Sequence, residues 1–192
     1  MTVAKALQQS AARLAEVGVD TPGLDARLLL AWVLKAWRED LAREPERELS
    51  AREQTIFNKA LALRAERRPL PYITGEQWFY GRPFKINRAV LIPRPETEML
   101  VTAALEKCAD NPAPRLADIG TGSGCLAVTL AAERPDARIW ATDLSRDALN
   151  VARKNAVRHG VAGRLTLLAG DLLAPLPPDA RLDVIVSNPP YV

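Results

Sequence analysis

The fold is decided by the stretch Asp118-Ile119-Gly120-Thr121-Gly122-Ser123-Gly124. It begins within Leu116-Ala117-Asp118-Ile119, which predicts a short buried strand, and it ends where residues 125–133 take on helical spacing. Glycines at such a junction let the backbone turn tightly and let a ligand approach the main chain. The stretch therefore predicts a strand, a ligand-binding loop and a helix in succession.

The spacing of these glycines indicates the class of ligand. A dinucleotide site has the pattern G-x-G-x-x-G, which would require a glycine at position 125, where this chain has Cys125. The pattern here is G-x-G-x-G, with Asp118 two residues before the first glycine. Because an acid in that place can receive an ammonium group, the loop favours S-adenosylmethionine, which has an amino-acid tail and no pyrophosphate. A dinucleotide site and a glycine turn without a ligand are the alternatives.

Helices and strands alternate in the chain after the loop. Strands are expected at 138–142, 165–168 and 183–187, and a helix is expected at 145–159. Such alternation predicts an α/β domain with a parallel sheet and right-handed crossovers.

Residues at two strand ends extend the predicted cofactor site. Asp143 ends the second strand, 19 residues after Gly124, where doubly wound folds place a carboxylate on ribose hydroxyls. The alternative for Asp143 is a helix cap. Asp171 and Leu172 follow the third strand, where an adenine would be held, and their alternative is a plain turn.

The fourth strand is followed by Asn188-Pro189-Pro190-Tyr191, which we expect to be the catalytic group. The side-chain oxygen of Asn188 and a proline carbonyl on a rigid backbone form two neighbouring acceptors. A planar –NH2 group offers two matching donors, and Tyr191 offers a face for stacking. An amide nitrogen is a poor nucleophile, so the clamp would act by orientation, which can be worth roughly 7–11 kcal/mol. The alternative is a proline-rich loop without chemistry.

Helices are expected throughout the first 70 residues. One would be capped by Thr2 and ended by Gly18, and a second would start at Thr21-Pro22 and cover 24–37. A short helix is expected at 39–43, and the capping box Ser50–Glu53 would begin a helix that runs to Arg68.

Three parts of the chain follow from these elements. A helical bundle is predicted at 1–70. A β-hairpin linker is predicted at 71–93, in which 72–74 pair with 84–86. The cofactor-binding domain is predicted at 94–192 and starts with a helix at 96–108.

Composition excludes several other classes of protein. No apolar run approaches the ~20 residues that span a bilayer, and the N-terminus lacks the apolar core of a secretory signal. Cys108 and Cys125 fit no metal spacing, so we expect no metal, reduced thiols and a cytoplasmic protein. Residues 1–70 carry 12 basic and 10 acidic side chains, and residues 71–192 carry 14 basic and 13 acidic ones. Neither part has the excess of basic residues expected of a nucleic-acid-binding protein.

Across its whole length the chain resembles the release factor glutamine methyltransferases (PrmC/HemK). The motifs that carry the resemblance include the glycine loop and the N-P-P-Y sequence described above. The others are Leu24-Asp25-Ala26-Arg27-Leu28-Leu29-Leu30, Tyr72-Ile73-Thr74-Gly75 and Val90-Leu91-Ile92-Pro93-Arg94-Pro95-Glu96-Thr97-Glu98. N-P-P-Y is shared with many nucleic-acid amino-methyltransferases, but its combination with I-P-R-P-E-T-E is highly specific.

The resemblance implies a Rossmann-like class I methyltransferase domain behind a substrate-docking helical domain. The implied reaction is methylation of the glutamine side-chain nitrogen in the Gly-Gly-Gln motif of class I peptide chain release factors. The cofactor would contact Gly120, Thr121, Gly122, Ser123, Gly124, Asp143, Leu172 and Asn188, in addition to Asp118 and Asp171. The glutamine would be held by Asn188–Tyr191 in a pocket walled by Phe79, Arg94 and Thr97.

Members of this family continue past N-P-P-Y with further strands, whereas this chain stops at Val192. The strand with Val184-Ile185-Val186 would then be an exposed apolar edge. We therefore expect a truncated monomer, and a fragment that binds the cofactor weakly and catalyses nothing is an alternative to an active enzyme. A methyltransferase for nucleic-acid amino groups and a truncated remnant, either cofactor-binding or inert, are the two alternative functions.

Overall fold

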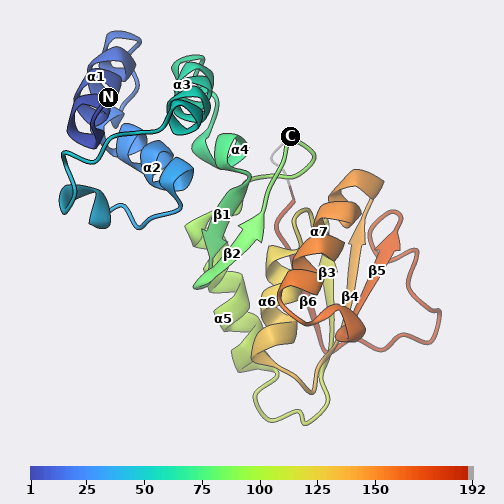
Figure 1. Cartoon of the computed structure of the whole chain (residues 1–192). Helices are drawn as coiled ribbons and strands as arrows, with labels where there is room; N and C mark the ends of the chain where they lie inside the picture. Colours follow the sequence, from blue (N-terminus) through green and yellow to red (C-terminus); the bar gives the residue numbers. More distant parts are fainter. Residues whose placement is uncertain (190–192) are drawn as a thin grey trace. The chain divides into compact units, whose positions relative to one another are not determined.

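The computed structural model describes residues 1–189 of the chain. Two compact units are present, Met1–Thr74 and Gly75–Val192. The first unit is helical and the second is built around a sheet (Figure 1). Within the described residues, no helix is both long and apolar enough to cross a membrane.

Five short helices make up the first unit. They are α1 Val3–Glu16, α2 Pro22–Leu34, the 3-10 turn η1 Asp40–Ala42, α3 Ala51–Ala65 and α4 Leu70–Thr74. Their buried side chains, among them Leu14, Leu30 and Phe57, form one hydrophobic cluster. The predicted helical N-terminal part is confirmed.

Two of the predicted helix starts are confirmed in detail. The hydroxyl of Thr2 accepts a hydrogen bond from the backbone N–H of Lys5 at 3.4 Å. Ser50 and Glu53 form the reciprocal capping box, in which each side chain accepts from the other's backbone N–H, at 3.3 and 2.8 Å.

The third predicted helix start is confirmed in position, because Thr21 is the N-cap of α2 and Pro22 follows in the first turn. Thr21 nevertheless makes no side-chain capping bond. Its hydroxyl donates instead to Asp25 at 2.9 Å, and Asp25 also accepts from Arg64 of α3 at 2.6 Å. Asp25 is buried, so its charge needs partners, and this need takes precedence over the cap.

Helix ends also depart from the predictions. The second helix stops at Leu34, where Lys35 turns to a φ of 53°, and α3 stops at Ala65 before Arg67, with a φ of 64°. A left-handed residue directly follows α2 and lies two residues after α3, and the sequence signals for such helix ends are weak when the residue is not glycine.

The hairpin is present, but its first strand was predicted in the wrong place. Strand β1 (Glu76–Phe79) pairs antiparallel with β2 (Arg82–Lys85), whereas residues 72–74 belong to α4. A two-residue turn, in which Tyr80 and Gly81 both have positive φ, joins the strands and sets Gln77 opposite Phe84. The predicted pairing required a longer loop, and the tight turn moves the partner strand towards the C-terminus.

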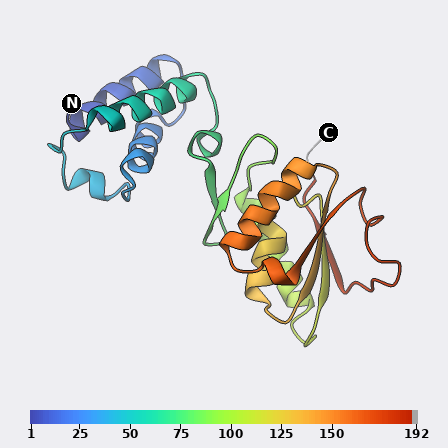
Figure 2. The ribbon, with the colours of Figure 1, turned by 45° about the vertical axis from the view of Figure 1, so that its right-hand side comes forward.

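The second unit contains the predicted α/β domain. Four parallel strands, β3 Arg115–Ile119, β4 Arg138–Asp143, β5 Leu165–Ala169 and β6 Val184–Ser187, lie in the order β5-β4-β3-β6. The helices are η2 Pro95–Thr97, α5 Glu98–Lys107, α6 Cys125–Glu133, α7 Arg146–Arg158 and η3 Ala162–Arg164. Figure 2 shows α5, α6 and α7 on one face of the sheet.

Strand order defines where a ligand can bind. Strand β3 lies between β4 and β6, and its last residue Ile119 is level with Thr142 on one side and Ser187 on the other. The loops after these three strands therefore emerge together at one edge of the sheet. In open parallel sheets, this reversal of strand order is where ligands bind.

Among residues 1–189, β6 is an edge strand that pairs only with β3. Its residue Ile185 is 52% exposed, whereas Val186 is buried. The expected exposed apolar edge is therefore present in the described part of the chain.

Candidate active site

The glycine loop is held in a conformation that needs its glycines. Gly120, Gly122 and Gly124 have φ values of 70°, 54° and 78°, which other residues rarely adopt. A side chain at Gly124 would also lie 3.0 Å from the Cβ of Ala152 on α7, whereas a side chain at Gly120 would meet no atom within 4 Å. Gly124 thus permits helix packing, and Gly120 leaves open space above the loop.

Asp118 lies under this loop and is fully buried. Its Oδ2 accepts hydrogen bonds from the hydroxyl of Thr121 at 2.7 Å and from the backbone N–H of Ala127 at 3.2 Å. Burial raises the pKa of Asp118 to about 6, although these two bonds lower it, and Asp143 raises it further. No donor in residues 1–189 bonds to Oδ1, so this oxygen remains available to a cation.

Asp143 braces the loop from the neighbouring strand. One carboxylate oxygen accepts from the N–H of Gly122 at 2.9 Å, and the other accepts from the N–H of Ser145 at 2.8 Å. The side-chain cap of α7 is Ser145, which accepts from Ala148 at 3.2 Å. Each oxygen of Asp143 keeps a second lone pair, so the residue can still accept from a ligand hydroxyl.

On the other side of β3, Asn188 is fixed by contacts at two points. Its Nδ2 donates to the hydroxyl of buried Thr97 at 2.8 Å. The preceding residue, Ser187, donates its hydroxyl to the carbonyl of Ile119 at 2.8 Å, which ties β6 to the end of β3. Pro189 is exposed, while Pro190 and Tyr191 lie outside the described residues.

One pocket joins the glycine loop, Asn188 and the segment before α5. It has a volume of about 370 Å³, part of it open to solvent. The lining residues are Leu91, Ile92, Pro93, Thr97, Asp118, Gly120, Thr121, Gly122, Ser123, Cys125, Leu126 and Asn188. Segments from three separate parts of the sequence, including six of the predicted cofactor residues, therefore meet in one place.

Cys125 could compete as a nucleophile in this pocket, but its chemistry excludes that role near neutral pH. Burial raises the pKa of its thiol to about 12, and the charge of Asp118 adds to the effect. The thiol is therefore protonated, and a thiol is a much weaker nucleophile than a thiolate.

Several predicted site residues lie outside the lining of this pocket. Phe79 is buried and packs edge-on against Phe84, with ring centroids 6.1 Å apart. Arg94 is exposed, and its carbonyl accepts from the N–H of Thr97. Asp171 is exposed, and Leu172 is 64% exposed with a φ of 46°. Their contacts with substrate or cofactor stay predictions.

Sequence reasoning missed a buried residue that supports the loop, Asn155 of α7. Its Nδ2 donates to the carbonyls of Ser123 at 2.8 Å and Lys85 at 3.0 Å, and its Oδ1 accepts from the N–H of Lys85 at 2.7 Å. One amide thus joins the glycine loop to the hairpin. The signal in the sequence was an asparagine on the apolar face of a helix, next to Val151, Ala152 and Ala156.

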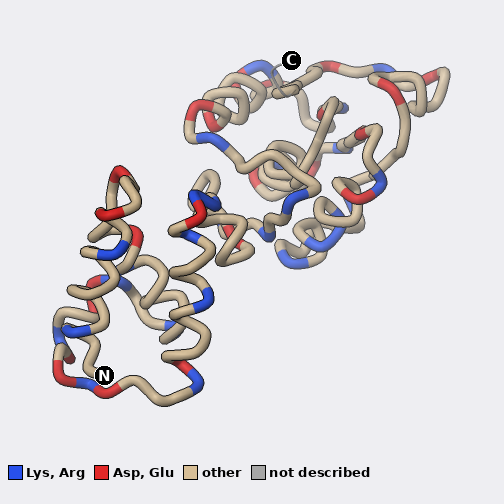
Figure 3. The backbone as a smooth tube through the Cα atoms, turned by 90° about the horizontal axis from the view of Figure 1, so that it is seen from above, with Lys and Arg blue, Asp and Glu red and all other residues tan. Residues whose placement is uncertain are grey.

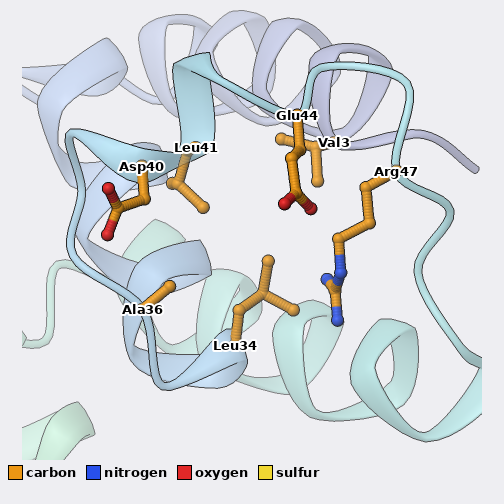
Figure 4. A pocket seen from close by; sticks show the side chains of 7 residues that line it. All are labelled: Val3, Leu34, Ala36, Asp40, Leu41, Glu44 and Arg47. Atoms are coloured by element: carbon orange, nitrogen blue, oxygen red, sulfur yellow. The ribbon is translucent and has the colours of Figure 1, made fainter.

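A second pocket lies within the helical unit (Figure 4). Leu34 points into it, and the side chains of Glu44 and Arg47 face it from the opposite side. Its remaining lining residues are Val3, Ala36, Asp40 and Leu41. Arg47 is already paired with Glu53 at 2.8 Å. The pocket has neither a glycine loop nor an amide clamp, so we assign the chemistry to the first pocket.

Comparison with known proteins identifies both units. Residues 5–75 match the family model of the PrmC N-terminal domain, and residues 96–192 match that of the methyltransferase small domain. The release factor glutamine methyltransferase of Moorella thermoacetica is 45% identical over 192 residues, which is all of this chain and 68% of that protein. The enzyme of the same name from Chlorobaculum tepidum is 43% identical and is covered to the same extent.

A solved structure is also similar. It is a SAM-dependent methyltransferase from Geobacter sulfurreducens in complex with S-adenosyl-L-homocysteine, with 26% identity and a TM-score of 0.40. The match covers 49% of this chain and 36% of that chain.

Proposed function

The chain belongs to the release factor glutamine methyltransferase family, whose members use S-adenosylmethionine, and we propose that it methylates glutamine in the Gly-Gly-Gln motif of class I peptide chain release factors. The observation that carries the proposal is the meeting of the glycine loop and Asn188 in one pocket. The loop offers an anion to a cofactor ammonium, and Asn188 offers an acceptor to an amide –NH2.

Features of the pocket fit the cofactor. Asp118 keeps Oδ1 available for an ammonium group, and the space above Gly120 leaves room for a ligand to approach the main chain. Asp143 would hold ribose hydroxyls, and Asp171 and Leu172 would lie beside the adenine. When bound, S-adenosylmethionine supplies an electrophilic methyl group.

Asn188 would orient the substrate nitrogen. Its Oδ1 would accept one N–H of the glutamine amide, and the carbonyl of Pro189 would accept the other, as Pro190 and Tyr191 complete the clamp. Accepting both bonds raises electron density on nitrogen and directs its lone pair towards the methyl group. The proton becomes acidic once nitrogen carries the methyl group, so no strong base is needed.

Charge distribution favours a protein substrate over a nucleic acid. Figure 3 shows basic and acidic residues interspersed along the described backbone, and the sequence, with 26 basic and 23 acidic residues, lacks the excess that would make a strongly basic surface. A nucleic-acid methyltransferase would need such a surface for phosphates and would have to unstack its target base. We propose that the helical unit docks the release factor, that the hairpin serves as a connector, and that the protein acts as a monomer in the cytoplasm.

Transfer of labelled methyl groups tests the proposal. The protein is incubated with labelled S-adenosylmethionine and a release factor, its Gly-Gly-Gln→Gly-Gly-Ala variant, DNA or RNA. We expect label only on the unaltered release factor, at glutamine. Label confined to nucleic acid would overturn the proposed substrate. Calorimetric titration with S-adenosylhomocysteine is run alongside, and failure of the folded protein to bind it would favour an inert remnant.

A further inference from the structure

The buried hydroxyl of Thr97 bonds to Asn188 and not to the adjoining helix α5. Thr97 is the last residue of η2 and has a helical backbone, so its side chain makes no capping bond to the first turn of α5. Its Oγ1 accepts from Nδ2 of Asn188 instead, across 91 positions of sequence. The side chain therefore contributes to the pocket in place of the helix start.

The turn that carries Thr97 is itself held in place. The backbone N–H of Thr97 donates to the carbonyl of Arg94 at 3.0 Å. The next residue, Glu98, accepts the backbone N–H of Tyr80 at 2.8 Å, so the hairpin turn anchors the start of α5. Thr97 consequently offers Asn188 a fixed partner.

The direction of this bond determines what Asn188 presents to a substrate. Donation through Nδ2 places Oδ1 on the other branch of the amide, and no donor in residues 1–189 bonds to Oδ1. A free carbonyl oxygen accepts from a primary amide, whereas a free –NH2 in its place would attract a carboxylate.

We propose that Thr97 is a positioning and specificity-determining residue that holds Asn188 with its acceptor oxygen towards the substrate. The pocket then favours glutamine over glutamate, which has the same shape but offers no N–H donors. This inference rests on the proposed function, because it assigns a role within the same glutamine site.

The experiment measures peptide binding with S-adenosylhomocysteine present, so that no reaction occurs. Two peptides, carrying Gly-Gly-Gln or Gly-Gly-Glu, are titrated into the wild type, Thr97→Val and Thr97→Ser. Valine keeps the shape and removes the hydroxyl, and serine keeps the hydroxyl. Thr102→Val is the matched control, since Thr102 is exposed on the same helix and outside the pocket.

We expect Thr97→Val to bind the glutamine peptide about 2- to 13-fold more weakly, as for one lost hydrogen bond, and to lose preference over the glutamate peptide. Its kcat should fall by about 10- to 100-fold, because small misplacements are costly in catalysis. Thr97→Ser should recover both properties, and Thr102→Val should match the wild type. All variants should bind S-adenosylhomocysteine equally.

Two outcomes separate this inference from the proposed function. If the wild type prefers the glutamine peptide and Thr97→Val behaves identically, the role of Thr97 is overturned and the proposed function stands. If the wild type neither binds nor methylates the glutamine peptide, the proposed function fails and this inference with it. Should valine prevent folding, Thr97→Ala replaces it in the same comparison.

Discussion

Lowering the pH from 7 to 5 should weaken cofactor binding, because Asp118 would lose the charge that receives the ammonium group. Its pKa is raised to about 6, primarily by burial. About nine in ten molecules would then carry the carboxylate at pH 7 and about one in ten at pH 5. Affinity for S-adenosylhomocysteine should therefore fall about tenfold, and its ammonium group remains largely protonated over this range.

The raised pKa of Asp118 has the opposite effect on folding stability, which this group increases as the pH is lowered. The folded pKa of Asp118, about 6, lies above its ordinary value of 3.8. The stability it contributes is fully present below pH 3.8 and is lost as pH rises through 6, a change of about 3 kcal/mol. Weaker binding at pH 5 thus does not arise from unfolding through this group.

Isothermal titration calorimetry at pH 5, 6 and 7 measures the effect, with buffers of two ionisation enthalpies to count the protons released on binding. Asp118→Asn is the control: it should bind weakly at every pH and show little pH dependence between these values. An affinity for S-adenosylhomocysteine that stays constant from pH 5 to 7 in the wild type would refute the assignment of Asp118 to the ammonium group.

Three further perturbations test the support around the site. Gly124→Ala should destabilise the fold by at least about 1–2 kcal/mol in denaturant unfolding, because residue 124 has a positive φ and an added side chain would contact α7. Gly163→Ala, with open space around the added side chain, should change stability by less than about 0.5 kcal/mol. Asn155→Ala should cost about 1–3 kcal/mol for each backbone group left unpaired and should weaken S-adenosylhomocysteine binding, while the exposed Asn150→Ala should do neither. Burial lowers the pKa of His159 in the folded protein. The stability that the neutral imidazole contributes is therefore present above pH 6.5 and is lost as pH falls through the folded pKa. His159→Phe should remove this loss, as measured by thermal unfolding between pH 5 and 7.

Sequence alone predicted those features that depend on local spacing. The glycine loop, the bounds of α6 and the α/β class follow from residues that are neighbours in the chain, and Ser50 caps α3 as its local pattern requires. The structure differs from these predictions where a residue distant in sequence, or the geometry of a turn, determines the contact. Thr21 pairs with an aspartate that a third helix helps to neutralise, and the hairpin shifts because its turn is shorter than predicted.

Contacts within the site were hidden from sequence for the same reason. Thr97 and Asn188 lie in two separate sequence motifs, and no spacing rule links residues 91 positions apart. Asn155 and Lys85 are separated by 70 positions, and their pairing depends on where α7 crosses the hairpin. Strand order supplies the missing information, because it decides which loops share an edge of the sheet.

The hairpin reaches both halves of the proposed active site. Through Lys85 and the amide of Asn155 it is joined to Ser123 in the glycine loop, and through Tyr80 and Glu98 it is joined to the turn that carries Thr97. Its far side is fixed to α7 by the ion pair of Arg158 with Glu76 at 2.6 Å. A distortion of β1 and β2 would therefore displace the cofactor loop and the amide clamp together. In this geometry the hairpin is a common support for the glycine loop and for the turn that holds Asn188.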